Sequence, residues 1–125
     1  MKINKELNLN YYDSYVPCNC EMCENYYLQI KDKFPNICAF LESMNINPLK
    51  PFELIWDDEE EYCVYFDCQY LVFGKIEENY KEVIDEIEIT QNKYFHPSTG
   101  VEEEHFILSF GPIKLKNIIG GKKDD

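Results

Sequence analysis

The hydrophobic pattern of the chain changes at Pro51. Before this proline, apolar residues recur at helical spacing, as in Met22, Tyr26 and Ile30, and after it they alternate with a period of two. An α-helix brings residues three or four apart onto one face, whereas a strand does so for alternate residues. Helices followed by strands predict an α+β fold, with one or two N-terminal helices packed on an antiparallel β-sheet of about four to five strands.

Two helices are expected before Pro51. Residues 21–34 are amphipathic, and Pro35 interrupts their pattern. Since proline is tolerated in the first turn of a helix, a second, short helix is expected over residues 35–44. Turn residues and two prolines in segment 45–51 then end the helical region.

Four strands are expected after Pro51, at residues 52–56, 62–73, 83–90 and 105–110. The first two form a hairpin, with the acidic run 57–61 as its exposed turn. Apolar and aromatic side chains on both faces of segment 62–73 predict that this strand lies in the centre of the sheet. Ile113 and Leu115 would extend the last strand.

The length of 125 residues suits one hydrophobic core. Residues 1–17 are polar and end in a proline, so we expect an irregular N-terminal arm. Residues 18–119 are expected to form a single α+β domain, and residues 120–125 a disordered tail.

The charge balance limits the partners. The chain has 24 acidic residues against 12 basic ones, all of them Lys, for a net charge of −12. It therefore lacks the guanidinium groups that usually grip phosphates, and it repels polyanions, which argues against direct binding to nucleic acid or an anionic membrane. A basic protein is the partner that such a charge favours.

Two acidic runs are the candidate docking residues for a basic partner. The alternative is that they are solvated turns that also block edge-to-edge strand pairing. The runs consist of Asp57, Asp58, Glu59, Glu60 and Glu61, and of Glu102, Glu103 and Glu104.

The start of the chain carries no secretory signal, and no apolar run is long enough to span a membrane, so a cytoplasmic location is expected. In that reducing compartment, the six cysteines are better interpreted as thiols or metal ligands than as three disulfides.

Cys18, Cys20 and Cys23 form the most specific motif, CxCxxC, at the start of the first expected helix. Three thiolates at this spacing could converge on one zinc ion. The preferred fourth ligand is His96, because it lies in a loop before a proline. The other candidates are Cys38, Cys63, Cys68 and His105.

Two alternatives for the motif stay open. The thiols could simply be packed or unligated, with no cofactor. Alternatively, Cys20 and Cys23 could form a redox pair, because the N-terminus of a helix lowers the pKa of a thiol. Against the redox interpretation, no buried apolar strand directly precedes the motif, and Glu21 and Glu24 favour the protonated thiol.

The two histidines do not indicate catalysis. A hydrolytic triad could be drawn from His96 or His105 with Ser98 or Thr99, but none of these hydroxyls lies on a recognisable nucleophile elbow. The segment HPSTG is more simply a turn. We therefore expect a non-enzymatic protein.

Several segments together resemble a family of small bacterial proteins that begin with a CxCxxCxN motif. The likeness lies in Cys18 to Asn25, in MNINPLKPFE (44–53), in QYLVFG (69–74), and in HPSTG with EEHF (96–106). Met44-Asn45 and Asn47 replace the Leu-Gly and Asp of the family. The resemblance implies a compact domain built around the cysteine motif.

Small acidic proteins of this kind also look like immunity proteins that neutralise secreted bacterial toxins. The leading hypothesis from the sequence is therefore an acidic binding protein, an immunity-type inhibitor of a basic toxin or nuclease. The alternative is a small zinc-binding or thiol-dependent protein centred on the CxCxxC motif.

Overall fold

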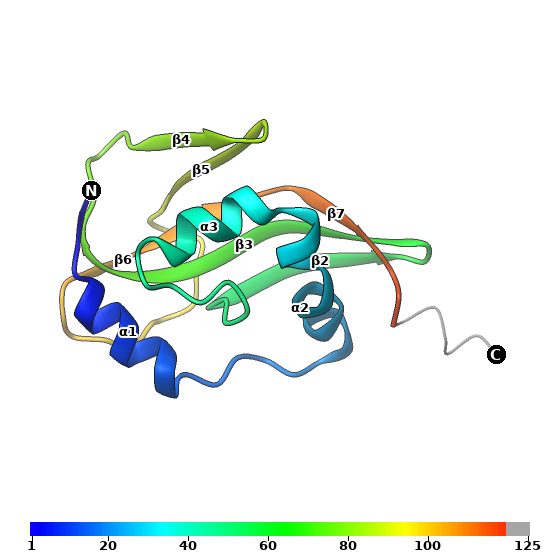
Figure 1. Ribbon diagram of the computed structural model, residues 1–125, viewed down its shortest axis with the longest axis horizontal. Coiled ribbons are helices and arrows are strands. Elements are labelled where there is room, and N and C mark those ends of the chain that lie inside the picture. The colour runs from blue at the N-terminus through cyan, green and yellow to red at the C-terminus, as the bar shows by residue number, and fades with distance from the viewer. Residues whose placement is uncertain (120–125) are drawn as a thin grey trace.

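The computed structural model describes residues 1–119 and combines helices with one antiparallel sheet (Figure 1). The helices in this part of the chain are α1 (Lys5–Ser14), α2 (Glu21–Lys33) and α3 (Pro35–Glu42). The strands are β1 (Lys2–Ile3), β2 (Glu53–Glu59), β3 (Tyr62–Lys75), β4 (Lys81–Ile84), β5 (Ile87–Asn92), β6 (His105–Phe110) and β7 (Ile113–Lys116). The predicted α+β fold is confirmed, with seven strands in place of four to five. The tail predicted at 120–125 lies outside the described residues.

Strand β3 is the centre of the sheet, as its apolar pattern predicted. One of its edges pairs with β2 and, at its far end, with β1. The other edge pairs with β7 at the start and with β6 along the rest. Strands β5 and β4 continue the sheet beyond β6. From Cys68 to Phe73 the side chains on both faces of β3 are buried, which fits the run of apolar residues there.

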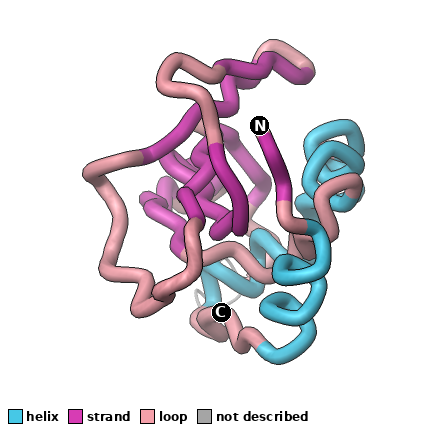
Figure 2. The backbone as a smooth tube through the Cα atoms, turned by 90° about the vertical axis from the view of Figure 1, so that its left-hand side faces the viewer, coloured by secondary structure: helices cyan, strands magenta, loops and turns pink. Residues whose placement is uncertain are grey.

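Helices α2 and α3 lie on one side of the sheet, which we call the inner side, whereas α1 lies at the edge of β3 and contacts the clusters on both sides (Figure 2). Alternate residues of β3 point toward the inner side. A bulge at Phe66 shifts this alternation by one residue, because Ile55 pairs with Asp67 and Trp56 with Tyr65. The inner-side residues of β3 are Cys63, Tyr65, Cys68, Tyr70 and Val72, all buried in the main core cluster.

A chain of hydroxyl groups crosses this core. Tyr70 Oη donates to the carbonyl oxygen of Pro48 at 2.6 Å, and Tyr26 Oη lies 2.7 Å from Tyr70 Oη. Since Tyr70 has one hydroxyl proton, Tyr26 is the donor of the second bond. Both rings can be buried because each hydroxyl group makes a hydrogen bond inside the core.

Residues 1–17 are not an irregular arm, which corrects the prediction. Residues 5–14 form α1, capped by the side chain of Asn4. Between the ends of β2 and β1, the β3 backbone lacks a strand partner, and α1 supplies side chains there instead. Tyr12 Oη donates to the carbonyl oxygen of Leu71 at 2.7 Å, and Asn8 Oδ1 accepts from the backbone N–H of Phe73 at 2.8 Å.

Two turns also differ from the prediction. Segment 83–90 is not one strand: β4 and β5 form a hairpin whose turn residues, Asp85 and Glu86, have φ values of 52° and 67°. The acidic run 57–61 is mostly strand, because β2 continues to Glu59 and the turn consists of Glu60 and Glu61.

A third difference concerns the end of the sheet. Ile113 and Leu115 belong to a separate strand, β7, that follows a break at Gly111. Gly111 has a φ of 143°, and a Cβ atom there would lie 2.5 Å from the carbonyl oxygen of Phe66. Only glycine fits this close approach to the β3 bulge. The break lets β6 and β7 pair with different parts of the same strand.

Candidate functional site

The three cysteines of the CxCxxC motif come together at the N-terminus of α2. Their Sγ atoms all lie within 4.8 Å of one another. Cys18 and Cys20 are exposed, whereas Cys23 is buried in the core beneath them. The motif therefore forms a compact sulfur cluster with one buried member and two members open to solvent.

The start of α2 explains this convergence. Cys20 is the N-cap residue, and its carbonyl oxygen accepts the helical bond from the N–H of Glu24 at 2.9 Å. The N–H of Cys20 points the other way, to Cys18 Sγ at 3.4 Å. Cys23, one turn into the helix, faces the sheet. The unsatisfied N–H groups at a helix N-terminus favour negative charge, which suits thiolates.

Two tyrosines hold the backbone of the motif in place. Tyr27 Oη donates to the carbonyl oxygen of Cys18 at 2.6 Å, and Tyr65 Oη donates to that of Met22. The first bond closes the segment back onto α2, and the second ties it to β3. The two bonds act at either side of Cys20, so they limit how far the sulfurs can separate.

Asn25, the polar residue of the CxCxxCxN pattern, connects the same helical turn to the end of β7. Its Nδ2 donates to the carbonyl oxygen of Lys116 at 3.1 Å, and its Oδ1 accepts from the N–H of Ile118 at 3.0 Å. The side chain is fully buried. Asn25 thus fixes the position of α2 below the cysteines and has a structural reason to follow them in the motif.

The thiols differ in how readily they ionise. The backbone N–H of Cys20 stabilises the charged form of Cys18 and, with a bond from the Cys20 thiol, lowers the pKa of the Cys18 thiol. Burial, followed by hydrogen bonds with Cys20 and Cys18, raises the pKa of Cys23. The thiolate therefore forms more readily at Cys18 than at Cys23.

The donor set fits a thiophilic metal ion. In a tetrahedral site with metal–sulfur bonds of about 2.3 Å, the sulfurs are about 3.8 Å apart. The sulfurs here lie within 4.8 Å of one another. This bound lies about 1 Å above the separation expected for three thiolates on one ion.

His96 is not part of the cluster, contrary to the prediction that it is the fourth ligand. Its Nδ1 donates to the carbonyl oxygen of Pro97 at 2.7 Å, and its ring packs 6.3 Å from that of Phe52. The sequence placed it only in a loop, and the loop carries it to the opposite, outer side of the sheet. The other candidates, Cys38, Cys63, Cys68 and His105, do not join the cluster either.

His105 has a role in holding its own loop. Its Nδ1 donates to the carbonyl oxygen of Glu103 at 2.7 Å, so in the neutral ring Nε2 accepts from the Thr99 hydroxyl, also at 2.7 Å. Both bonds connect the loop before β6 to the first residue of that strand. Thr99 and His105 therefore stabilise this turn, in agreement with the interpretation of HPSTG as a turn.

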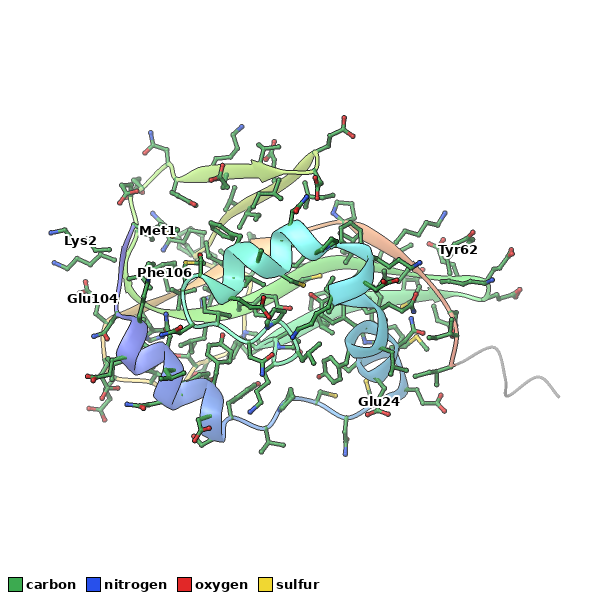
Figure 3. All side chains as sticks on the ribbon, in the orientation of Figure 1. Met1, Lys2, Glu24, Tyr62, Glu104 and Phe106 are labelled. Atoms are coloured by element: carbon green, nitrogen blue, oxygen red, sulfur yellow. The ribbon has the colours of Figure 1, made fainter. Side chains whose placement is uncertain are left out.

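The two acidic runs lie at opposite ends of the molecule. Glu59, Glu60 and Glu61 adjoin Tyr62 at one end of β3, whereas Glu104 precedes His105, which pairs with Phe73 near the other end. At about 3.3 Å per residue, that length of strand spans on the order of 35 Å. Figure 3 shows Tyr62 and Glu104 at the two ends of the long axis. The runs do not form one continuous acidic surface.

The sequence did not single out Tyr27 and Tyr65 as supports of the motif. Tyr27 lies in the helix expected over residues 21–34 and Tyr65 in the strand expected over residues 62–73; Tyr65 is buried and Tyr27 half-buried. Only the position of their hydroxyl groups, which depends on how α2 crosses β3, shows the second role. The one local indication of this role in the sequence is that Tyr27 follows Cys23 by four residues, one helical turn.

A comparison of the chain with protein-family models finds no match, and the same holds for comparisons with curated proteins and with solved structures. The resemblance to the CxCxxCxN family therefore stays a prediction. None of the helices within residues 1–119 is long and apolar enough to cross a membrane.

Proposed function

We propose that the protein binds one zinc ion through the thiolates of Cys18, Cys20 and Cys23. The observation that carries this proposal is the convergence of the three Sγ atoms to within 4.8 Å of one another. Thiolates select soft or borderline ions such as zinc over magnesium or calcium. The backbone supports at Tyr27 and Tyr65 favour a site that is formed before the metal arrives.

The site would leave one coordination position to a ligand from outside the cluster. Three protein ligands with an open fourth position are typical of zinc sites that exchange a water or another molecule, whereas structural sites are closed by four. Because Cys18 and Cys20 are exposed, this position faces solvent. We propose metal binding without catalysis, in a reducing compartment such as the cytoplasm, where the thiols stay available.

The test is a titration of metal-free, reduced protein with zinc, together with cobalt as a spectroscopic probe of thiolate ligation. We expect one ion per chain and sulfur-to-cobalt charge-transfer absorption. Replacing an exposed ligand, Cys20→Ser, should remove most of the affinity because only two sulfurs remain. The matched control is Cys38→Ala, a buried thiol in α3 that should leave binding unchanged.

Two outcomes would overturn the proposal. One is that the reduced wild-type protein binds neither ion. The other is binding that Cys20→Ser and Cys38→Ala affect equally, since the motif would then not be the site. Circular dichroism of each variant shows whether it is folded, so that loss of structure is not mistaken for loss of a ligand.

Inhibition of a basic toxin or nuclease is the second candidate. It is favoured by the net charge of −12 and by the exposed carboxylates at the tip of the β2–β3 hairpin. Because the two acidic runs are far apart, a partner of ordinary interface size would engage one of them. Reversing Glu59, Glu60 and Glu61 to Lys should slow association with the partner and flatten its salt dependence, and an unchanged rate would remove the idea.

A further inference from the structure

The outer side of the sheet carries an exposed apolar patch near the β2–β3 hairpin. Phe66, Ile55 and Tyr62 expose 50%, 45% and 39% of their surface, and the half-buried Val64 lies between Phe66 and Tyr62 along β3. We call Ile55, Tyr62, Val64 and Phe66 the distal patch. Contiguous exposed apolar surface of this kind is typical of a binding site.

The distal patch has oppositely charged borders. On the β2 side, Asp57 pairs with Val64 and Glu59 with Tyr62, so both carboxylates share the outer side with the patch. On the β7 side, Lys114 pairs with Val64 and Lys116 with Tyr62. All four charged residues are exposed. Lys114 Nζ lies 4.8 Å from the centre of the Tyr62 ring, at the border of the patch.

The helices do not cover this surface. Helices α2 and α3 pack on the inner side of the sheet, as Figures 1 and 2 show, and α1 lies near the other end of β3. The other half of the outer side is buried in a second cluster of Leu71, Phe73 and Ile107, which α1 and Val101 cover. No such cover lies over the distal patch within residues 1–119.

We propose that the distal patch binds the distal patch of a second copy of this chain, with the two-fold axis parallel to β3. Rotation about that axis sets the Asp57 and Glu59 row of each copy against the Lys114 and Lys116 row of the other. A two-fold axis across the strands would instead oppose acid with acid. The face is therefore complementary to itself in one orientation.

Charge balance is the reason to choose a second copy over another partner. The two carboxylates and two ammonium groups at the borders sum to zero, whereas the chain as a whole carries −12. A basic partner would be attracted more strongly to other surfaces of the protein, and a polyanion would be repelled by all of them. Two copies meet with less repulsion on a face whose two borders carry opposite charges than on the acidic remainder of the surface.

The proposed axis also has a specific cost. It keeps both hairpin tips at the same end of the dimer, so Glu60 and Glu61 of one copy approach those of the other. These residues are exposed, and like charges at close range oppose association. Neutralising them should therefore strengthen the dimer, an effect that an axis across the strands would not produce.

The first test is sedimentation equilibrium of the metal-free protein across the micromolar range. We expect a monomer–dimer equilibrium that Phe66→Asp shifts at least tenfold toward monomer. The matched control is Leu28→Asp on α2, which places the same charge at a residue 65% exposed on the other side of the sheet and should leave the equilibrium unchanged. A wild-type protein that stays monomeric, or equal effects of the two variants, would overturn the proposal.

The second test uses charge reversal and does not depend on Phe66. D57K/E59K and K114E/K116E should each dimerise more weakly than wild type, and an equimolar mixture should recover a heterodimer. The variant E60Q/E61Q should dimerise more tightly. A mixture that is no better than either variant alone would overturn the orientation. Since these measurements use metal-free protein, their failure is separate from failure of the zinc proposal.

Discussion

The two halves of β3 are alike in sequence pattern but differ in what covers their outer side. At Leu71 and Phe73 the outer side is buried beneath α1 and the loop before β6. At Tyr62 and Phe66 the same alternation places aromatic rings in solvent. The period-two pattern of a strand thus determines which side of the sheet a residue occupies. Segments distant in sequence determine whether that side is buried.

The halves also differ in how the strand edge is completed. Near Tyr62 both edges of β3 pair with strands, so the backbone needs nothing more. Near Leu71 and Phe73 one edge depends on side chains of α1. We therefore expect stability to be sensitive to side-chain changes in the covered half and tolerant of them in the open half.

The largest expected effect is on folding stability in the covered half. Leu71→Ala should lower the free energy of unfolding by about 2–5 kcal/mol, because it removes buried methyl groups and leaves a cavity. Phe66→Ala, on the same side of the same strand, should change the stability of the monomer by about 0.5 kcal/mol or less. Urea denaturation at low protein concentration measures both. Similar losses for the two variants would remove the distinction between the halves.

A smaller loss is expected from the edge contacts of α1. Asn8→Ala removes a bond from the Phe73 N–H at 2.8 Å and a bond to the Met44 carbonyl oxygen at 2.9 Å, both buried. The expected destabilisation is about 1–3 kcal/mol, because the backbone groups lose their partner without gaining water. Asn10→Ala, at an exposed position of the same helix, is the control.

Hydrogen exchange sharpens the same comparison. In Asn8→Ala, the amide of Phe73 should exchange faster, while amides in the part of β3 that pairs with both β2 and β7 keep their protection. Uniform acceleration along β3 would mean that the strand opens as one unit, and that α1 does not hold one half separately.

A further effect is expected only at high pH. Burial raises the pKa of Tyr26 and of Tyr70 well above the usual 10.0, so the folded state keeps protons that the unfolded chain releases. Their contribution to stability is complete below about pH 10 and declines as the pH rises further, by about 1.4 kcal/mol per pH unit for each group. Urea midpoints measured at pH 9 and above would check this. A flat profile would contradict the buried hydroxyl chain.

Much of the fold could be predicted because it is local. The change of period at Pro51 separated helices from strands, and the apolar residues on both faces of segment 62–73 marked the central strand. Helix α1 was missed because its buried contacts are made by polar groups of Asn8 and Tyr12, which give no apolar stripe. The β4–β5 turn was missed because Asp85 and Glu86 adopt positive φ without glycine, asparagine or proline nearby.

In the candidate site, too, the local features could be predicted and the distant ones could not. Cys18, Cys20 and Cys23 converge because a helix begins within the motif, and their spacing shows this. The position of His96 depends on a loop that crosses to the outer side of the sheet. The sequence around His96 does not predict the path of this loop. The charge of the acidic runs was plain from composition, but their separation follows from the length of β3.

The three cysteines outside the motif are buried at different places: Cys38 in α3, Cys63 near the hairpin and Cys68 in the middle of β3. In the native protein, an alkylating reagent should reach Cys18 and Cys20 first, whereas these three react only when their surroundings open. Mass spectrometry of pulse-labelled peptides would then time each opening separately, with no introduced probe. The three buried cysteines therefore report the order in which these parts of the structure unfold.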